Sequence, residues 1–71
     1  MDIVVKTKYD IGQTIYHYYI NNNNKNIVKD KISNIEVYVN DKSIDVYYVT
    51  EQLFILKENK LFSNEFEISK I

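Results

Sequence analysis

The stretch that most constrains the fold of this chain is TIYHYYI, residues 14–20. Apart from His17, every residue in it is β-branched or aromatic, and these residue types are enriched in β-strands. Alternation along a strand places two sets of side chains on opposite faces, with Ile15, His17 and Tyr19 on one and Tyr16, Tyr18 and Ile20 on the other. Both sets are largely apolar, so we expect a strand that is covered on both sides, as in a small curled barrel.

Length and composition favour one small β domain, residues 1–71. A domain of this size buries only about 60% of the surface that its unfolded chain exposes. The chain has no cysteine, so neither a disulfide nor a thiolate metal site can stabilise it. It has no alanine, which weakens helices, and it is rich in isoleucine, valine and tyrosine, which favour strands. We therefore expect one compact core and no deep active-site cavity.

Turn-forming residues divide the chain into five predicted strands, at residues 2–8, 14–20, 27–40, 44–50 and 53–56. Gly12 marks a turn before the second strand because it accepts a positive φ. The asparagine-rich residues 21–26, NNNNKN, read as a hairpin tip. In the long third strand the apolar alternation slips near Ser33 and Asn34, as it does at a β-bulge.

The last residues of the chain predict a short helix. Ser63 or Asn64 is expected to cap it, and Asn64 with Glu67 three residues later matches a capping box. We expect Phe66 and Ile71 to face the core. Together these elements predict a mainly β fold: a small, five-stranded, SH3-like, partly open barrel with a short C-terminal helix.

Three short motifs resemble a family of short SH3-like β-barrel proteins from phages and mobile elements. They are YDIGQTIY at residues 9–16, YYV at 47–49 and LFSNE at 61–65. The last differs in one respect, because Phe66 separates two acids that are adjacent in those proteins. The resemblance implies an SH3-like barrel, a phage setting and no catalytic residues. Small phage proteins of this size often inhibit host defence systems, such as CRISPR effectors, by stoichiometric binding.

We do not expect this chain to be an enzyme. His17 is its only histidine, and no carboxylate or serine lies beside it in the sequence. A metal site would need several carboxylates near one imidazole, but the acids are scattered singly along the chain. The sequence therefore predicts no catalytic residue, no metal and no cofactor.

Binding to another protein is the function that the sequence favours. Seven tyrosines are more than so small a core can enclose with their hydroxyls satisfied. Tyrosine is enriched at interfaces, and we predict an exposed patch of Tyr16 and Tyr18, joined by Tyr47. AT-rich codons are by themselves a sufficient explanation for the tyrosine content, so the content alone indicates no function. The predicted function is a non-catalytic protein-binding module, with a host protein as partner.

The alternative is a small barrel that binds single-stranded nucleic acid by stacking bases on aromatic rings. Lys29 and Lys31 would contribute to its basic strip. The net charge of −1 and the lack of arginine disfavour this alternative. A third possible function, after binding of a protein or of nucleic acid, is self-association into a homodimer through an exposed strand edge.

Nothing in the sequence indicates a membrane segment. No apolar run approaches the roughly 18 to 20 residues that a membrane-spanning helix needs. The first residues, MDIVVKTKYD, are charged and do not read as a signal peptide. We therefore expect a cytoplasmic protein, in the host cytosol if a phage encodes it.

Overall fold

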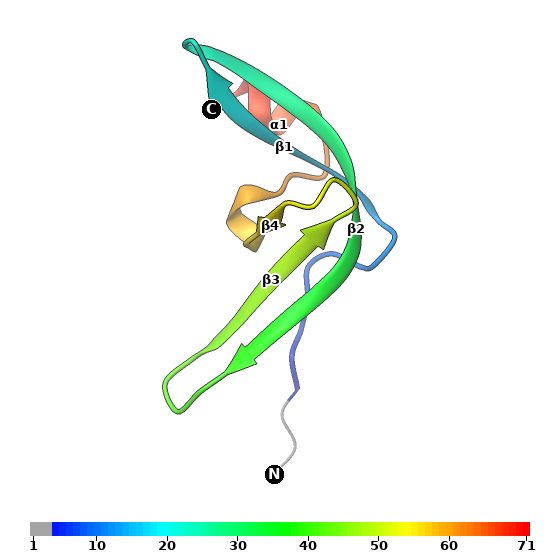
Figure 1. The fold of residues 1–71 in the computed structure, drawn as a ribbon, viewed down its shortest axis with the longest axis vertical. Coiled ribbons are helices and arrows are strands. Elements are labelled where there is room, and N and C mark those ends of the chain that lie inside the picture. Colours follow the sequence, from blue (N-terminus) through cyan, green and yellow to red (C-terminus); the bar gives the residue numbers. More distant parts are fainter. Residues whose placement is uncertain (1–3) are drawn as a thin grey trace.

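Two antiparallel hairpins share one long strand, β2, and form an open sheet with the strand order β1-β2-β3-β4 (Figure 1). The structure, a computed structural model, describes residues 4–71. The strands are β1 (Thr14–Asn21), β2 (Asn24–Val39), β3 (Ile44–Thr50) and β4 (Ile55–Leu56). They are followed by a 3-10 helix, η1 (Glu58–Lys60), and a short α-helix, α1 (Glu65–Ser69). The prediction of a mainly β fold with a short C-terminal helix is confirmed.

β2 serves both hairpins because it bends at a β-bulge. β1 pairs with its first half and β3 with its second half. The register shifts between Ile32 and Asn34, so Ser33 is the extra residue, as the slip in the apolar pattern predicted. The Ser33 hydroxyl donates to the carbonyl of Val49 at 3.1 Å. The bend directs the β2–β3 hairpin away from β1 and contributes to the 47 Å long axis of the molecule (Figure 1).

Two of the predicted turns, at Gly12 and at Asn22–Asn23, contain residues with positive φ. Gly12 has a φ of +89°, and its amide donates to the carbonyl of Ile32 at 2.7 Å. The tip of the β1–β2 hairpin is Asn22 and Asn23, with φ values of 51° and 64°. A two-residue turn with both φ values positive matches the twist of the strands that it joins, and asparagine accepts that conformation well. The turn at Gly12 is confirmed. The hairpin tip predicted at residues 21–26 is shorter than expected, because Asn21 belongs to β1 and residues 24–26 belong to β2.

The core lies beside the bend of β2. Its buried hydrophobic side chains are Tyr9, Ile15, Ile32, Tyr48 and Leu61. The rings of Tyr9 and Tyr48 meet edge to face, with centroids 5.6 Å apart. The Tyr9 hydroxyl donates to the carbonyl of Leu61 at 3.1 Å, and the Tyr48 hydroxyl accepts from the amide of Lys8 at 3.1 Å. Both buried hydroxyls therefore have partners, as buried tyrosines require.

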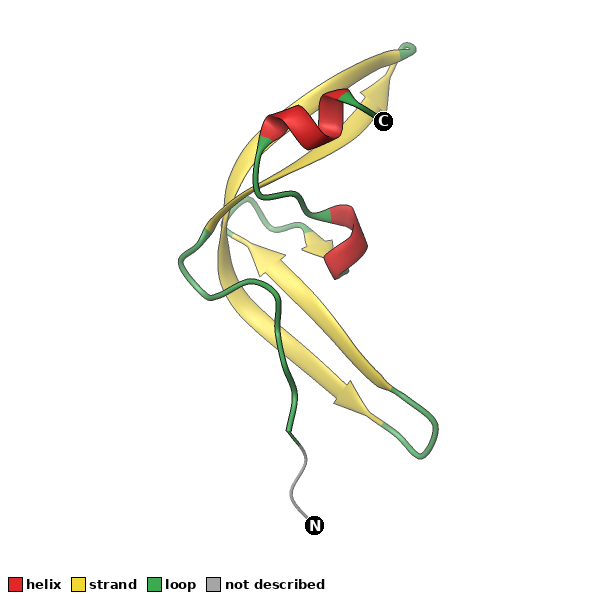
Figure 2. Ribbon diagram, turned by 180° about the vertical axis from the view of Figure 1, so that it is seen from behind, coloured by secondary structure: helices red, strands yellow, loops and turns green. Residues whose placement is uncertain are grey.

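The sheet has four strands among the described residues, not the five that were predicted. The expected strand at residues 2–8 lies partly outside the described residues, and residues 4–8 form no strand. Instead, this segment crosses one face of the sheet (Figure 2), where the amide of Lys8 donates a hydrogen bond to the hydroxyl of Tyr48. The predicted strand at residues 53–56 is reduced to Ile55–Leu56, because Leu53 has a φ of +68° and extends the preceding turn. The predicted SH3-like, partly open barrel is not confirmed, because the four strands form an open sheet.

The C-terminal segment, residues 61–71, packs on the β1–β2 hairpin. Phe62 forms an isolated antiparallel bridge to Tyr16, with two backbone hydrogen bonds of 2.8 Å. α1 then lies against β1 (Figure 2). The bridge extends the sheet by one residue beyond the free edge of β1, without closing it.

Asn64 begins the helix as predicted, but a different residue faces inward. The Asn64 side chain accepts a hydrogen bond from the amide of Glu67 at 3.0 Å. Ile68 is fully buried, whereas Phe66 is 74% exposed and Ile71 62% exposed. The expectation that Phe66 and Ile71 face the core is therefore wrong. Phe66 and Ile68 are two positions apart and lie nearly on opposite sides of the helix, so burial of Ile68 turns Phe66 to solvent, and Ile71 lies beyond the end of α1.

Candidate protein-binding surface

Tyr16 and Tyr18 lie on one face of β1, and both are half-buried. The Tyr16 backbone pairs with Phe62, and the ring of Tyr18 lies 6.2 Å from the Phe62 ring. The ammonium of Lys25 lies 5.4 Å from the centroid of the Tyr18 ring and also donates to two carbonyls near the end of α1. The C-terminal segment therefore borders these two tyrosines, and their face is only partly exposed.

Lys29 and Lys31 are both exposed on β2, and Lys29 lies directly across from Tyr16 in the strand register. The structure thus brings four of the predicted residues to one part of the sheet. A shallow depression of about 260 Å³ beside the lysines is lined also by Asp30 and Glu51. These two acids place negative charge next to the two lysines.

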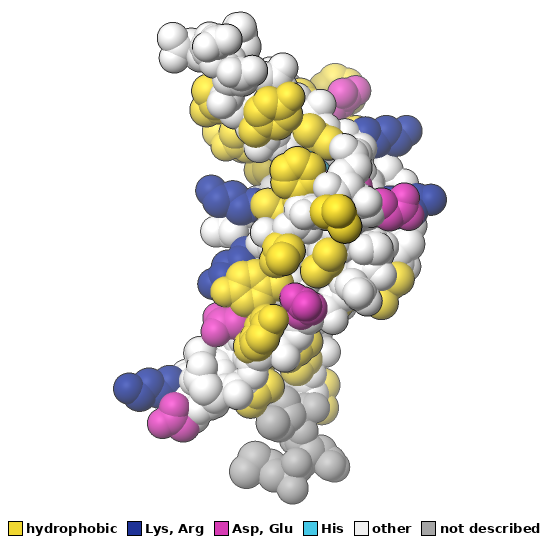
Figure 3. Space-filling model, viewed as in Figure 1, with side chains coloured by type: hydrophobic (Ala, Val, Ile, Leu, Met, Phe, Trp, Pro, Cys, Tyr) yellow, Lys and Arg dark blue, Asp and Glu magenta, His cyan; other side chains and the backbone are white. Residues whose placement is uncertain are grey.

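Tyr47 lies in a groove on the β2–β3 hairpin, apart from the other predicted residues. The groove has a volume of about 370 Å³ and is lined by Glu36, Tyr38, Asp45, Tyr47 and Ile55. Tyr38 is 54% exposed and Ile55 62% exposed. In Figure 3, hydrophobic side chains form a band along this side of the molecule, with acidic side chains beside it. The groove is therefore both aromatic and acidic.

The strand register fixes the order of side chains in the groove. Glu36 lies across from Tyr47, and Tyr38 lies across from Asp45. Each tyrosine consequently has a carboxylate as its cross-strand neighbour. The two rings meet edge to face, with centroids 5.6 Å apart and an interplanar angle of 79°. This packing of one ring on the other restricts both side chains.

Lys57 of the same chain contacts two residues of this groove, Tyr47 and Asp45. The Lys57 ammonium lies 5.4 Å from the centroid of the Tyr47 ring and 3.7 Å from a carboxylate oxygen of Asp45. Its side chain is 53% exposed, and that of Asp45 is 37% exposed. Ion pairs this exposed contribute little to stability, because water screens them.

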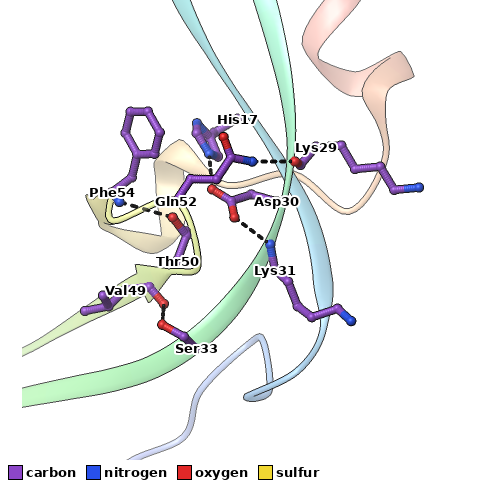
Figure 4. A network of polar contacts seen from close by, with 9 residues as sticks. All are labelled: His17, Lys29, Asp30, Lys31, Ser33, Val49, Thr50, Gln52 and Phe54. Atoms are coloured by element: carbon purple, nitrogen blue, oxygen red, sulfur yellow. Dashed lines mark hydrogen bonds and ion pairs between the residues drawn. The ribbon is translucent and has the colours of Figure 1, made fainter.

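His17 is buried and pairs with Asp30, which the sequence did not place near it (Figure 4). His17 Nε2 lies 3.0 Å from Asp30 Oδ2. The carboxylate can only accept, so Nε2 donates. The ring of Phe54 lies over the imidazole, with centroids 4.6 Å apart. The only histidine of the chain is thus an internal hydrogen-bond donor that links β1 to β2.

The network continues from Asp30 to the turn after β3. The other carboxylate oxygen of Asp30 accepts from the amide of Lys31 at 2.8 Å. The hydroxyl of Thr50 accepts from the amide of Phe54 at 3.1 Å, and the Gln52 side chain donates to the carbonyl of Lys29 at 2.9 Å (Figure 4). These bonds tie the turn that carries Phe54 to β2.

The environment of Asp30 keeps it ionised. Burial raises the pKa of the carboxyl, but hydrogen bonds from His17, from Thr50 and from the backbone amides of Lys31 and Gln52 outweigh burial. The pKa of Asp30 therefore lies below its ordinary value of 3.8. A charged Asp30 adds to the negative charge beside Lys29 and Lys31.

The His17 and Asp30 side chains are shielded from solvent. The two side chains are 4% and 1% exposed. Within residues 4–71, no group of three or more histidines, cysteines or acids is arranged to hold a metal ion. In the same residues no helix has the length and apolar character needed to cross a membrane.

Sequence reasoning missed most of the groove, although the signal was present. Ile35, Val37 and Val39 alternate along the sequence of β2, and this alternation assigns Glu36 and Tyr38 to the opposite face of the same strand. The turn at residues 40–43 then fixes which residues of β3 lie across from them. Strand alternation thus indicates that Glu36 and Tyr38 share a face, whereas their pairing with Tyr47 and Asp45 follows from the register that the structure shows.

Comparison with known proteins adds no relative. No protein-family model, no curated protein and no solved structure matches this chain. These comparisons therefore add no support to a functional assignment.

Proposed function

We propose that this protein is a non-catalytic module that binds another protein through the groove on its β2–β3 hairpin. The observation that carries the proposal is the exposure of Tyr38 and Ile55 beside Tyr47, on three neighbouring strands of the sheet, β2, β4 and β3. Tyrosine provides a large contact area with few rotatable bonds. Because the strands already hold the backbone, binding requires little further ordering of the groove.

The environment of His17 supports the non-catalytic part of the proposal. The imidazole is enclosed between Asp30 and the ring of Phe54. The nearby Thr50 hydroxyl is itself buried and already bonded to the amide of Phe54. A general base must reach the proton that it abstracts from a bound substrate, and this histidine is enclosed by the protein.

The partner that we propose is a host protein. The resemblance of the sequence to short phage and mobile-element proteins favours a defence component, such as a CRISPR effector. The protein would inhibit such a component stoichiometrically, by occupying a surface in the host cytosol. The small size of the domain suits stoichiometric inhibition, because a groove and its rim are enough surface to occupy a site on a partner.

The test compares capture by matched variants in nuclease-treated host lysate. The bait is the wild type, the Tyr38→Ser/Tyr47→Ser double variant or the Tyr19→Ser control. Tyr19 is 49% exposed on β1 and lies outside the groove. We expect one protein that the wild type and the control retain and the double variant loses. Equal capture by all three baits would overturn the assignment to the groove.

Two further measurements separate this surface from the others. If a Tyr16→Ala/Tyr18→Ala variant folds but no longer captures the partner, the binding site is on β1 and not in the groove. Circular dichroism checks that it folds. Light scattering measures the oligomeric state of the wild type. A dimer that Tyr38→Ser/Tyr47→Ser dissociates would assign the groove to self-association instead.

The alternative function, binding of single-stranded nucleic acid, is favoured by one observation. Lys29 lies across from Tyr16, so an ammonium and an aromatic ring are neighbours on paired strands. The charge on Asp30 and Glu51 beside the lysines opposes this function. Affinity for an oligothymidine strand that falls steeply with salt, and that Lys29→Gln/Lys31→Gln abolishes, would establish it.

A further inference from the structure

We infer that the groove recognises a basic side chain of the partner protein, arginine in preference to lysine. This inference rests on the proposed function and specifies the chemistry of the partner. Three features of the groove carry it: its paired rings, its two carboxylates and the lysine that already lies at its edge.

The rings and carboxylates are arranged as a site for a cation. Tyr38 and Tyr47 offer ring surfaces, and Glu36 and Asp45 lie directly across from them on the paired strands. A cation over an aromatic ring is attracted by the electrons of the ring face, and a nearby carboxylate adds a direct charge interaction. A neutral or acidic side chain would gain neither interaction and would meet two negative charges.

Lys57 shows that a cation is stable in this environment. Its ammonium lies over the Tyr47 ring and 3.7 Å from Asp45, as the ammonium of a partner would. The lysine side chain is 53% exposed, so the contact is weak and a stronger cation can displace it. Lys57 therefore competes with a partner's cation for the part of the groove formed by Tyr47 and Asp45.

Glu36 provides the unmatched charge. Its carboxylate accepts a hydrogen bond of 3.4 Å from the hydroxyl of Tyr38, but it forms no ion pair among the described residues. The negative charge at this end of the groove is thus available to a partner. Glu36 is half-buried, so an ion pair formed here is less screened than one on an open surface.

Arginine fits this combination better than lysine does. Its planar guanidinium stacks on a tyrosine ring and can bond a carboxylate through two nitrogens at once. The exposed Ile55 lies at the same groove and offers an apolar contact for the hydrocarbon part of the side chain.

The inference is tested with short synthetic peptides. The probe is the capped peptide Gly-Ser-Arg-Ser-Gly, and the matched peptides carry lysine, citrulline or glutamate in the central position. Backbone amide NMR shifts measure binding. We expect shifts at Glu36, Tyr38, Asp45 and Tyr47, with arginine binding most tightly, lysine less tightly and the other two not at all. Equal binding of the citrulline peptide would overturn the inference, because citrulline keeps the shape and lacks the charge.

Two variants and a control sharpen the result. Glu36→Gln/Asp45→Asn should weaken binding of the arginine peptide by about tenfold, the effect of removing two partly exposed charge pairs. Asp41→Asn, an exposed acid in the turn between β2 and β3, should leave it unchanged. Lys57→Gln should strengthen binding by about two- to threefold, because it removes the competing ammonium. Weaker binding after Lys57→Gln would contradict the inference.

The same variants in the lysate capture keep the two proposals distinct. If Tyr38→Ser/Tyr47→Ser loses the captured protein and Glu36→Gln/Asp45→Asn retains it, the groove binds a protein but not through a cation. If both double variants lose it and the Tyr19→Ser control retains it, both proposals are supported. If neither loses it, both fail.

Discussion

Nε2 of His17 and Oδ2 of Asp30 are 3.0 Å apart on neighbouring strands, although the two residues are 13 positions apart in the chain. The pair lies where β2 approaches its bend, and the Phe54 ring covers the histidine. This contact links β1, β2 and the turn after β3 in one buried network.

Replacing Asp30 with asparagine should lower the free energy of unfolding by roughly 2 kcal/mol, because hydrogen bonds to a charged acceptor are replaced by weaker ones. Urea denaturation followed by circular dichroism measures the change. Asp41→Asn, at an exposed position in a turn, is the control and should have no measurable effect. A variant as stable as the wild type would show that the buried pair contributes little.

Acid should destabilise the protein through the same carboxylate. The pKa of Asp30 in the folded protein is below its ordinary 3.8, so between these two values the unfolded chain binds more protons than the folded one. The stabilisation is complete above about pH 5 and is lost as the pH falls through the folded pKa. Urea titrations from neutral pH to about pH 2 should show the wild type and Asp30→Asn converging in stability. A difference that stays constant with pH would contradict this assignment.

Replacing Tyr48 with phenylalanine should release the N-terminal segment while the core remains packed. The lost hydroxyl leaves the amide of Lys8 without its acceptor and should cost about 1 kcal/mol. Hydrogen exchange at the Lys8 amide should accelerate, while exchange in β2 changes only in proportion to global stability. Tyr19→Phe removes an exposed hydroxyl and serves as the control. Unchanged protection of Lys8 would refute the role of this bond.

Replacing Leu53 with glycine should stabilise the protein. Leu53 has a φ of +68°, which is unfavourable for a bulky residue, and its side chain is 85% exposed, so little packing is lost. Relief of strain, reduced by the greater freedom of glycine in the unfolded chain, should raise the free energy of unfolding by about 0.5–1 kcal/mol. Leu53→Ala keeps the β-carbon and should remain close to the wild type. A loss of stability in Leu53→Gly would show that the leucine side chain makes a contact worth more than the strain.

Local sequence patterns were sufficient for several elements. The strands around residues 14–20 and 44–50 follow from unbroken β-branched and aromatic residues, and the bulge at Ser33 follows from the slip in alternation. The cap at Asn64 was also predicted correctly, because capping depends on residues three positions apart. These features are decided within a few residues, where spacing alone describes the geometry.

The predicted strand at the N-terminus failed for a non-local reason. Val4 and Val5 are β-branched, but a strand needs a neighbouring strand to pair with. The amide of Lys8 donates instead to the hydroxyl of Tyr48, a residue 40 positions away in the chain. Similarly, Phe66 is as apolar as Ile68, and only the packing of α1 on β1 decides that Ile68 is the buried one.

The sequence by itself determined that this chain forms short strands with tight turns and a capped final helix. Those properties depend on side-chain shape and backbone preference at neighbouring positions. Only the tertiary structure decided that His17 meets Asp30 and that Glu36, Tyr38, Asp45 and Tyr47 share one groove. These contacts depend on strand register and on the bend of β2, which couple residues that are distant in the chain. The candidate site is a product of that register, and the sequence alone supplied its residue types without their arrangement.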